Sequence, residues 1–389
     1  MDRPSPVDRV AALDGLRGLT AVVVVVYHAW LLTKAPELDG GPLRDLLSTG
    51  FLAVDVFFVL SGFVLLLPTA ATGDPGPTRD YVVKRIARIG PAYWVALVVA
   101  VAAFDLLASP GLDRDRALAP EGLLAHALFL ETEARLLPGW DGLLGLGVNP
   151  VLWTLALEAS FYAVLPFVAG PFVRRPVVWT AGALLLSAAT RAVADGRGQT
   201  GQELLSLLPA GAFSFAAGMA AAVAYVHVRE GRARLPVRPH ALAVLATAGL
   251  LLTMGLAGGA DPGQVRDDAR TSQAVGLAVP ALCALLTVGC ALGAPRVLAG
   301  RLGRVLGELS YGLYLVHFMV LLLALNSLGF ARDGSARAFA QALAFALPAS
   351  LVLAVLSHVA VERPARRAAR RMLARRAADR ASGAASATA

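Results

Sequence analysis

The first apolar segment of the chain carries two ionisable side chains, Arg17 and His28, at the ends of the stretch RGLTAVVVVVYH. In a helix, this spacing brings the two positions to within about 20° of the same face, with a rise of about 16 Å between them. Arg17 and His28 therefore lie on one stripe at two different depths. Because ionisable groups inside apolar helices are rare, we expect both to face a cavity or the interior of a helix bundle.

Asp55 is the carboxylate placed to act on the same imidazole. It lies near the start of the second apolar segment, GFLAVDVFFVLSGFVLL, at a depth that matches His28 near the end of the first. A carboxylate beside an imidazole fixes the tautomer and stabilises the imidazolium, which is the arrangement that a general base requires. The alternative is a buried polar pair that only holds two helices together.

Three further cations, Lys84, Arg85 and Arg88, cluster in the stretch KRIARIGPAYW at the membrane level of Arg17. Guanidinium groups bind phosphates bidentately, and several of them together suit a polyphosphate ligand such as coenzyme A. The alternative is the ordinary excess of positive charge that membrane proteins carry on their cytoplasmic side.

The elements that position these side chains are predicted to be membrane-spanning helices. The 389 residues are 57% hydrophobic and 16% charged, with a mean hydropathy of +0.65, outside the range of soluble globular proteins. Two cysteines are too few for a disulfide framework or a zinc set. A helix of roughly 20 apolar residues spans a bilayer. The sequence thus predicts an all-α integral membrane protein with about ten spans, at 18–33, 51–68, 92–109, 151–170, 176–193, 204–227, 240–259, 272–293, 308–328 and 338–361.

The arginines predict the orientation of these spans. They concentrate in alternate loops, as in 78–88 and 228–238, so both termini are expected in the cytoplasm. The basic tail 365–389 is expected to be largely disordered, and its charge indicates topology rather than nucleic-acid binding, with a role at anionic lipid as the alternative. The amphipathic segment 121–137 is predicted to be a helix at the membrane interface.

Glu158 lies in the fourth span, in the stretch WTLALEASFY with Trp153 and Tyr162. Entering from the outside, it is expected to approach the acceptor side of the chamber that holds His28, where it could orient a hydroxyl group. The alternative is a buried carboxylate bonded to a neighbouring helix.

His317 ends the stretch SYGLYLVH in the ninth span, after Tyr311. A single histidine in a membrane helix is more often a packing group, and a supporting role beside the donor channel is the alternative. Ser61 is expected to allow close helix approach beside Gly62 rather than to act as a nucleophile, because the spacing puts no base next to it.

Together these stretches resemble the membrane-bound acyltransferase 3 family, whose members move acyl groups onto sugars and other extracytoplasmic acceptors. The matching pieces occur in the family's order: LDGLRG at 13–18 with YH at 27–28, FFVLSGF at 57–63, KRIARIGPAYW at 84–94, NPVLWTLALEASFY at 149–162, LSYGLYLVH at 309–317 and ERP at 362–364.

The resemblance implies an acyltransferase domain over residues 1–364 in a bacterial plasma membrane. It implies that cytoplasmic acetyl-CoA, or another short acyl-CoA, donates an acyl group to a hydroxyl of an acceptor, with extracytoplasmic carbohydrate as the leading class. Catalytic roles fall to His28, Asp55 and Glu158. The donor phosphates are assigned to Arg17, Lys84, Arg85 and Arg88, and supporting roles to Tyr93, Trp153, Tyr162, Tyr311 and His317.

The chain departs from the family pattern at two positions, with Thr154 where serine is common and Ala159 where a second acid often follows Glu158. The acceptor would contact the 109–150 segment and the 33–50 loop. Two other functions stay open: acylation of a secondary metabolite such as a macrolide, and proton-coupled transport of a small anion. No metal site is expected, because the acidic and histidine residues lack ligand spacing.

Overall fold

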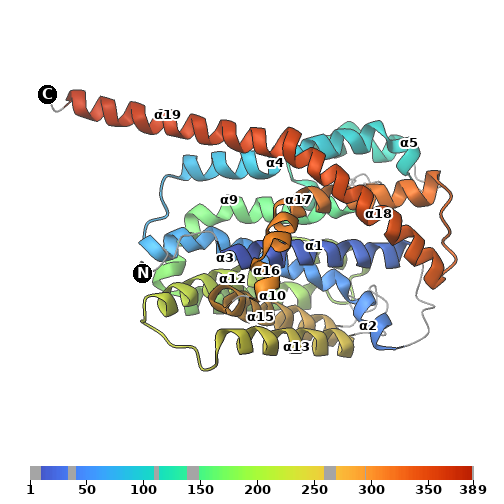
Figure 1. Ribbon diagram of the computed structural model, residues 1–389, viewed down its shortest axis with the longest axis horizontal. Helices are drawn as coiled ribbons and strands as arrows, with labels where there is room; N and C mark the ends of the chain where they lie inside the picture. Colours follow the sequence, from blue (N-terminus) through green and yellow to red (C-terminus); the bar gives the residue numbers. More distant parts are fainter. Residues whose placement is uncertain are drawn as a thin grey trace.

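The computed structural model describes residues 10–33, 41–108, 114–137, 149–257, 269–293 and 295–387. Within these ranges the chain folds into helices and turns with no strands. Ten helical stretches are long and apolar enough to cross a membrane, one for each predicted span. The protein is an all-α integral membrane protein, and its long helices run side by side (Figure 1).

The helices fall into two groups by length, eleven long ones and seven short ones, among the described residues. The long ones are α1 (Ala11–Leu32), α3 (Ala53–Thr72), α4 (Thr78–Ala102), α9 (Trp153–Arg174), α10 (Pro176–Ala194), α12 (Leu208–Arg229), α13 (Pro239–Ala257), α15 (Ala269–Gly293), α17 (Arg301–Leu322), α18 (Ala336–Ser357) and α19 (Arg363–Ala387). The short ones are α2 (Pro42–Ser48), α5 (Phe104–Leu107), α6 (Arg114–Ala117), α7 (Pro120–Ala127), α8 (Glu131–Ala134), α11 (Gly198–Leu205) and α16 (Arg296–Ala299). Single turns stand at Gly50–Leu52, Pro150–Leu152, Leu323–Ser327 and His358–Glu362.

Glycines bring α1 and α17 into backbone contact. A Cβ atom on Gly307 of α17 would lie 2.2 Å from the carbonyl oxygen of Asp14, and one on Gly18 of α1 would lie 2.6 Å from the carbonyl carbon of Leu306. No larger residue fits at either position without a shift of backbone. The glycines of the LDGLRG stretch therefore set the distance at which α1 presents its ionisable residues to α17.

A second glycine pair joins α3 to α12. A Cβ on Gly62 would lie 2.1 Å from the carbonyl oxygen of Phe215, and one on Gly218 would lie 2.0 Å from that of Val59. The expected close helix approach beside Gly62 is confirmed, but the expectation that no base lies next to Ser61 is wrong, because its hydroxyl lies 2.6 Å from Oε1 of Glu158. Asp55 lies two turns before Gly62, and Ser214 one turn before Gly218, so the same crossing brings these two polar side chains together.

Two helices differ most from their predicted extent. The third span was placed at 92–109, but α4 begins at Thr78, because Lys and Arg are good helix formers and the helix continues through the basic residues. The tail from 365 is helical as far as Ala387, as α19, where the sequence suggested disorder. With α18 and the turn His358–Glu362, α19 forms one long bent run that packs on α4 and projects beyond the bundle (Figure 1).

The predicted interfacial helix at 121–137 is two short helices, α7 and α8. They are separated at Phe129, whose φ of 58° is incompatible with a continuous right-handed helix. Cys283 and Cys290 are both buried in α15 as free thiols.

Substitution of Gly62 by alanine tests the contact between α3 and α12. The added methyl group meets a backbone carbonyl that cannot move alone, so we expect a loss of about 1–3 kcal/mol in the free energy of unfolding. The measurement is the Tm of purified protein in detergent. Gly182→Ala on α10 is the matched control, since its new Cβ would meet no atom within 4 Å. Equal Tm values for the two variants would contradict the packing account.

Candidate active site

Two cavities inside the bundle hold most of the ionisable residues singled out in the sequence. We call the first the basic cavity; it has a volume of about 460 Å³ and lies between α1, α3, α4, α9, α17 and the start of α19. The second, the histidine cavity, has a volume of about 690 Å³ and contains His28 and Asp55 in its wall. The phosphate-binding and proton-transfer residues proposed from the sequence are therefore divided between two spaces.

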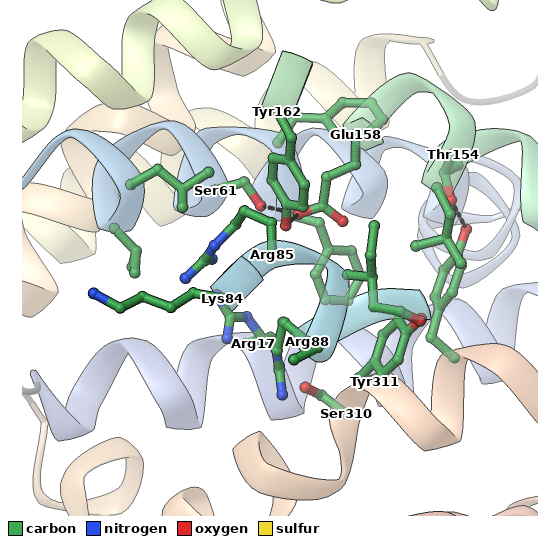
Figure 2. A pocket seen from close by; sticks show the side chains of 18 of the residues that line it. Arg17, Ser61, Lys84, Arg85, Arg88, Thr154, Glu158, Tyr162, Ser310 and Tyr311 are labelled. Carbon is green, nitrogen blue, oxygen red and sulfur yellow. Dashed lines mark hydrogen bonds between the residues drawn. The ribbon is translucent and has the colours of Figure 1, made fainter. Parts of the chain in front are cut away.

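The basic cavity is lined by six cationic side chains and one carboxylate, Glu158. The four predicted cations lie together here (Figure 2), and two more from α19 line the same cavity. Arg17 and Arg88 lie next to each other near Ser310, and Lys84 and Arg85 point into the same space. The cations are Arg17, Lys84, Arg85, Arg88, Arg366 and Arg370. So many like charges in one cavity repel each other, and a bound polyanion would offset that repulsion.

Tyrosines hold two of these guanidinium groups. Arg85 lies 5.8 Å from the ring centroid of Tyr162, and Arg88 lies 5.6 Å from that of Tyr311, within the range of cation–π attraction. The hydroxyl of Tyr311 is itself fixed, since it donates a hydrogen bond to the carbonyl oxygen of Ile89 at 2.5 Å. Tyr162 and Tyr311, both expected to support the site, thus keep the arginines facing the cavity.

Glu158 lies in the basic cavity, away from the histidine cavity where the sequence suggested it. Its Oε1 accepts hydrogen bonds from the hydroxyls of Ser61 at 2.6 Å and Tyr162 at 2.5 Å (Figure 2). The reason is helical geometry. Trp153, which does line the histidine cavity, is five residues earlier on α9, and this rotates Glu158 by about 140° around the helix axis.

His28 is paired with His317 rather than with Asp55. The Nδ1 atom of His28 lies 3.0 Å from Nε2 of His317, whereas Asp55 accepts a hydrogen bond at 2.6 Å from the hydroxyl of Ser214. The two glycine crossings explain the difference, because one packs α1 on α17 and the other packs α3 on α12. Asp55 and His28 still share the histidine cavity.

Backbone carbonyls determine the tautomers of the histidine pair. Nδ1 of His317 lies 2.7 Å from the carbonyl oxygen of Tyr314, which can only accept, so this nitrogen carries the proton. In neutral His317 the Nε2 atom must then accept, and His28 donates to it from Nδ1. The remaining nitrogen of His28, Nε2, is therefore unprotonated and has the lone pair that a general base needs.

A thin wall separates the two cavities. Val54 and Phe58 of α3 and Tyr314 of α17 line both of them. The hydroxyl of Tyr314 is 2.8 Å from that of Thr154, which holds the ring across the gap between α17 and α9. Any substrate that extends from the arginines to His28 must pass these side chains.

The sequence missed several residues of the site. Tyr314 was seen only as a neighbour of His317, although its spacing of three from both Tyr311 and His317 puts it on their face of α17. Four polar residues of α11 and its flanks line the histidine cavity. The sequence did not predict them, because a short helix between two spans has no pattern that indicates a binding site. They are Gln199, Gln202, Glu203 and Ser206.

The acceptor segment expected at 109–150 falls partly outside the described residues, which omit 109–113 and 138–148. Residues 34–40 of the 33–50 loop also lie outside them. Arg135, from the described part, lines the histidine cavity. No group of three or more His, Cys, Asp or Glu side chains that could hold a metal ion is found in the part of the chain that the structure describes.

Tyr93 and His317 are the supporting residues that line neither cavity; His317 contacts His28, whereas Tyr93 lies apart from the catalytic candidates. It is fully buried, and its hydroxyl donates to the carbonyl oxygen of His126 at 2.9 Å and to Oε1 of Glu131 at 3.3 Å. Tyr93 therefore fixes α7 and α8 to α4. Burial raises the pKa of Glu131 to about 8 and lowers the pKa of His126 to about 4.

Comparison with known proteins agrees with this arrangement. A family profile for an acyltransferase domain, that of acyltransferase 3, matches residues 10–359. The chain belongs to the acyltransferase 3 family. The match includes all residues of the histidine cavity and most of the basic cavity, and it ends before α19.

Several curated relatives from bacteria carry the names of acyltransferases. The chain is 26% identical over 339 residues to a Bacillus subtilis protein that carries the provisional name of a peptidoglycan O-acetyltransferase, YrhL, covering 81% of this chain and 49% of that protein. It is 30% identical over 164 residues to the acyltransferase MdmB of Streptomyces mycarofaciens, covering 42% of this chain and 40% of MdmB. This chain thus spans half or less of these relatives. No solved structure gives a significant match.

Replacement of Glu131 by glutamine tests the anchoring of α7 and α8. The pKa of Glu131 is higher in the folded state than its ordinary 4.5, so folding binds a proton that is lost as the pH rises toward 8, and stability falls with it. Between pH 7.5 and 8.5, a full pH unit above the ordinary histidine pKa of about 6.5, the Tm of the wild type should fall while that of Glu131→Gln stays flat. Glu121→Gln, an exposed neighbour on α7, should behave as the wild type does. A wild-type Tm that rises over this range would contradict the account.

Proposed function

We propose that the protein transfers an acyl group, of which acetyl is the leading case, from acyl-CoA to a hydroxyl group of an acceptor. The observation that carries this proposal is the pair of adjoining cavities, one rich in arginine and one with a basic imidazole nitrogen, which share only a thin wall. Transport of a small anion no longer competes as the main function, because the family is one of acyltransferases.

The end of the bundle with the basic cavity faces the cytoplasm in this proposal. The positive-inside rule supports that orientation, since the loops at this end carry the arginines. Acyl-CoA binds its phosphates to Arg17, Arg85 and Arg88, and Lys84 adds charge at the entrance. The rise of about 16 Å from Arg17 to His28 matches an extended pantetheine arm. The arm passes the wall between the cavities and presents the thioester to the imidazole.

His28 acts as the general base. Its Nε2 removes the proton from the acceptor hydroxyl, and the oxygen attacks the thioester carbonyl. Collapse of the tetrahedral intermediate breaks the carbon–sulfur bond, and the CoA thiolate takes the proton from the imidazolium. His317 keeps the reactive tautomer in place by accepting from Nδ1, and Asp55 stabilises the positive charge across the cavity.

Glu158 has a positioning role in this scheme rather than a catalytic one. It accepts from both Ser61 and Tyr162, and Tyr162 in turn faces Arg85. One carboxylate among the arginines limits their repulsion when the cavity is empty. The expected task of orienting the acceptor passes to residues of the histidine cavity.

An extracytoplasmic carbohydrate is the acceptor class that the histidine cavity favours. Its lining offers carboxamide, carboxylate and hydroxyl groups from Gln199, Gln202, Glu203 and Ser206, and an indole from Trp153. Sugars combine many hydroxyl groups with an apolar ring face, so this lining suits them. A secondary metabolite with a sugar or hydroxyl group is the alternative acceptor.

Release of free thiol from acetyl-CoA by the purified protein, with soluble peptidoglycan fragments added as the carbohydrate acceptor in every thiol-release assay, tests the proposed function. We expect the wild type to release thiol, and His28→Ala to reduce the rate by about 10²–10⁴-fold while its Kd for CoA stays unchanged. His317→Gln keeps a carbonyl that can accept from His28, so it should retain more activity than His317→Leu. Thiol release that survives in His28→Ala would refute a base at this position.

A larger side chain in the wall tests the passage between the cavities. Val54→Trp should block the pantetheine arm, so that acyl transfer is lost while CoA binding in the basic cavity persists. The control is Val98→Trp on the exposed face of α4. Binding is measured by isothermal titration of CoA, and transfer by thiol release. Full activity of Val54→Trp would mean that the donor takes another route.

A further inference from the structure

The start of α19 forms part of the basic cavity. Arg366, Ala369 and Arg370 line it, on one face of the helix at spacings of three and four residues. Arg367 and Arg371, each one residue further on, are rotated by about 100° and exposed outside the cavity. The family match ends at residue 359, so the family resemblance does not assign these arginines a role.

Glu362 fixes the angle at which α19 leaves α18. Its side chain is 1% exposed, and its Oε2 lies 3.7 Å from Nη1 of Arg88 and 3.4 Å from Nη2 of Arg366. It also lies 3.6 Å from Nδ1 of His358. This buried carboxylate therefore ties a guanidinium of α19 to one of α4 across the mouth of the cavity.

Arg366 is held in place by part of its guanidinium group, while the rest of the group can still bind a ligand. Its Nε donates to the backbone carbonyl of Glu362 at 3.3 Å, and its Nη2 faces the Glu362 carboxylate and His358. Among the described residues, no hydrogen bond engages Nη1. An arginine has five donors, so one edge of this guanidinium stays available to a ligand. Arg370, one turn further along, is more exposed.

The chemistry of CoA determines which part of it would meet α19. The thioester is at one end of the molecule, the diphosphate is in the middle, and the ribose 3′-phosphate is at the far end. With the thioester at His28 and the diphosphate at Arg17, Arg85 and Arg88, the 3′-phosphate reaches the mouth of the cavity. A phosphate monoester carries close to two charges near neutral pH, which suits a pair of arginines.

We propose that Arg366 and Arg370 bind the 3′-phosphate of CoA and make the protein select CoA thioesters over donors that lack this group. This inference rests on the proposed function, because it needs acyl-CoA in the basic cavity. It assigns to α19 a part in donor selection: 3′-dephospho-CoA and the phosphopantetheine arm of a carrier protein would both leave these two arginines without a ligand.

The experiment compares kcat/KM for acetyl-CoA and acetyl-3′-dephospho-CoA, with thiol release as the readout. We expect the wild type to prefer acetyl-CoA by about tenfold or more, the effect of losing one charged hydrogen-bonded contact. Arg366→Gln/Arg370→Gln should lose this preference through a lower kcat/KM for acetyl-CoA alone. Arg370→Gln, which leaves the Glu362 contacts intact, should show a partial loss.

The matched control is Arg367→Gln/Arg371→Gln, which removes the same charge from the exposed face of the same helix. It should keep the full preference. A wild type with equal kcat/KM for both donors would overturn the inference, and thiol release from acetyl-CoA would still support the proposed function. Equal losses for both donors in Arg366→Gln/Arg370→Gln would also overturn it, and would indicate a role in structure or at anionic lipid. A wild type inactive with both donors would contradict the proposed function itself.

Discussion

The backbone contact between α1 and α17 is the constraint on which the rest of the site depends. Gly18 and Gly307 allow it, since a methyl group at either position would meet backbone atoms of the other helix. At this distance His28 and His317 lie within hydrogen-bond reach, and the tautomer of one determines that of the other. In a membrane, where helices gain little by hiding apolar surface from lipid, such small-residue contacts are the main source of specific packing.

In the proposed function, the basic cavity binds the charged part of the donor and the histidine cavity supplies the base. The arginines require a polar space that an anion can enter, whereas an imidazole serves as a base only if no phosphate or cation holds its lone pair. Val54, Phe58 and Tyr314 separate the two environments with apolar and aromatic surface. In the proposed function, the narrow and uncharged pantetheine arm passes between these side chains.

The sequence predicted the number of spans and the arginine cluster, because hydropathy and helical spacing determine these locally. It could not predict that His317 rather than Asp55 would pair with His28, since the pairing depends on which helices cross at glycines. The sequence placed Glu158 in the wrong cavity for a similar reason, because the rotation of a residue about the α9 axis depends on how that helix packs. The sequence predicted disorder for the arginine-rich residues of α19. No local sequence pattern indicates that Glu362 lies beside Arg88 and so holds the start of that helix against α4.

The most direct test of the central claim is a structure with a non-hydrolysable acetyl-CoA analogue in which a methylene group replaces the thioester sulfur. The account predicts phosphate density against Arg17, Arg85 and Arg88, an arm that passes Tyr314, and the acetyl carbonyl carbon beside Nε2 of His28. A nucleotide bound in the histidine cavity, or an acetyl group that stays on the arginine side of the wall, would contradict it.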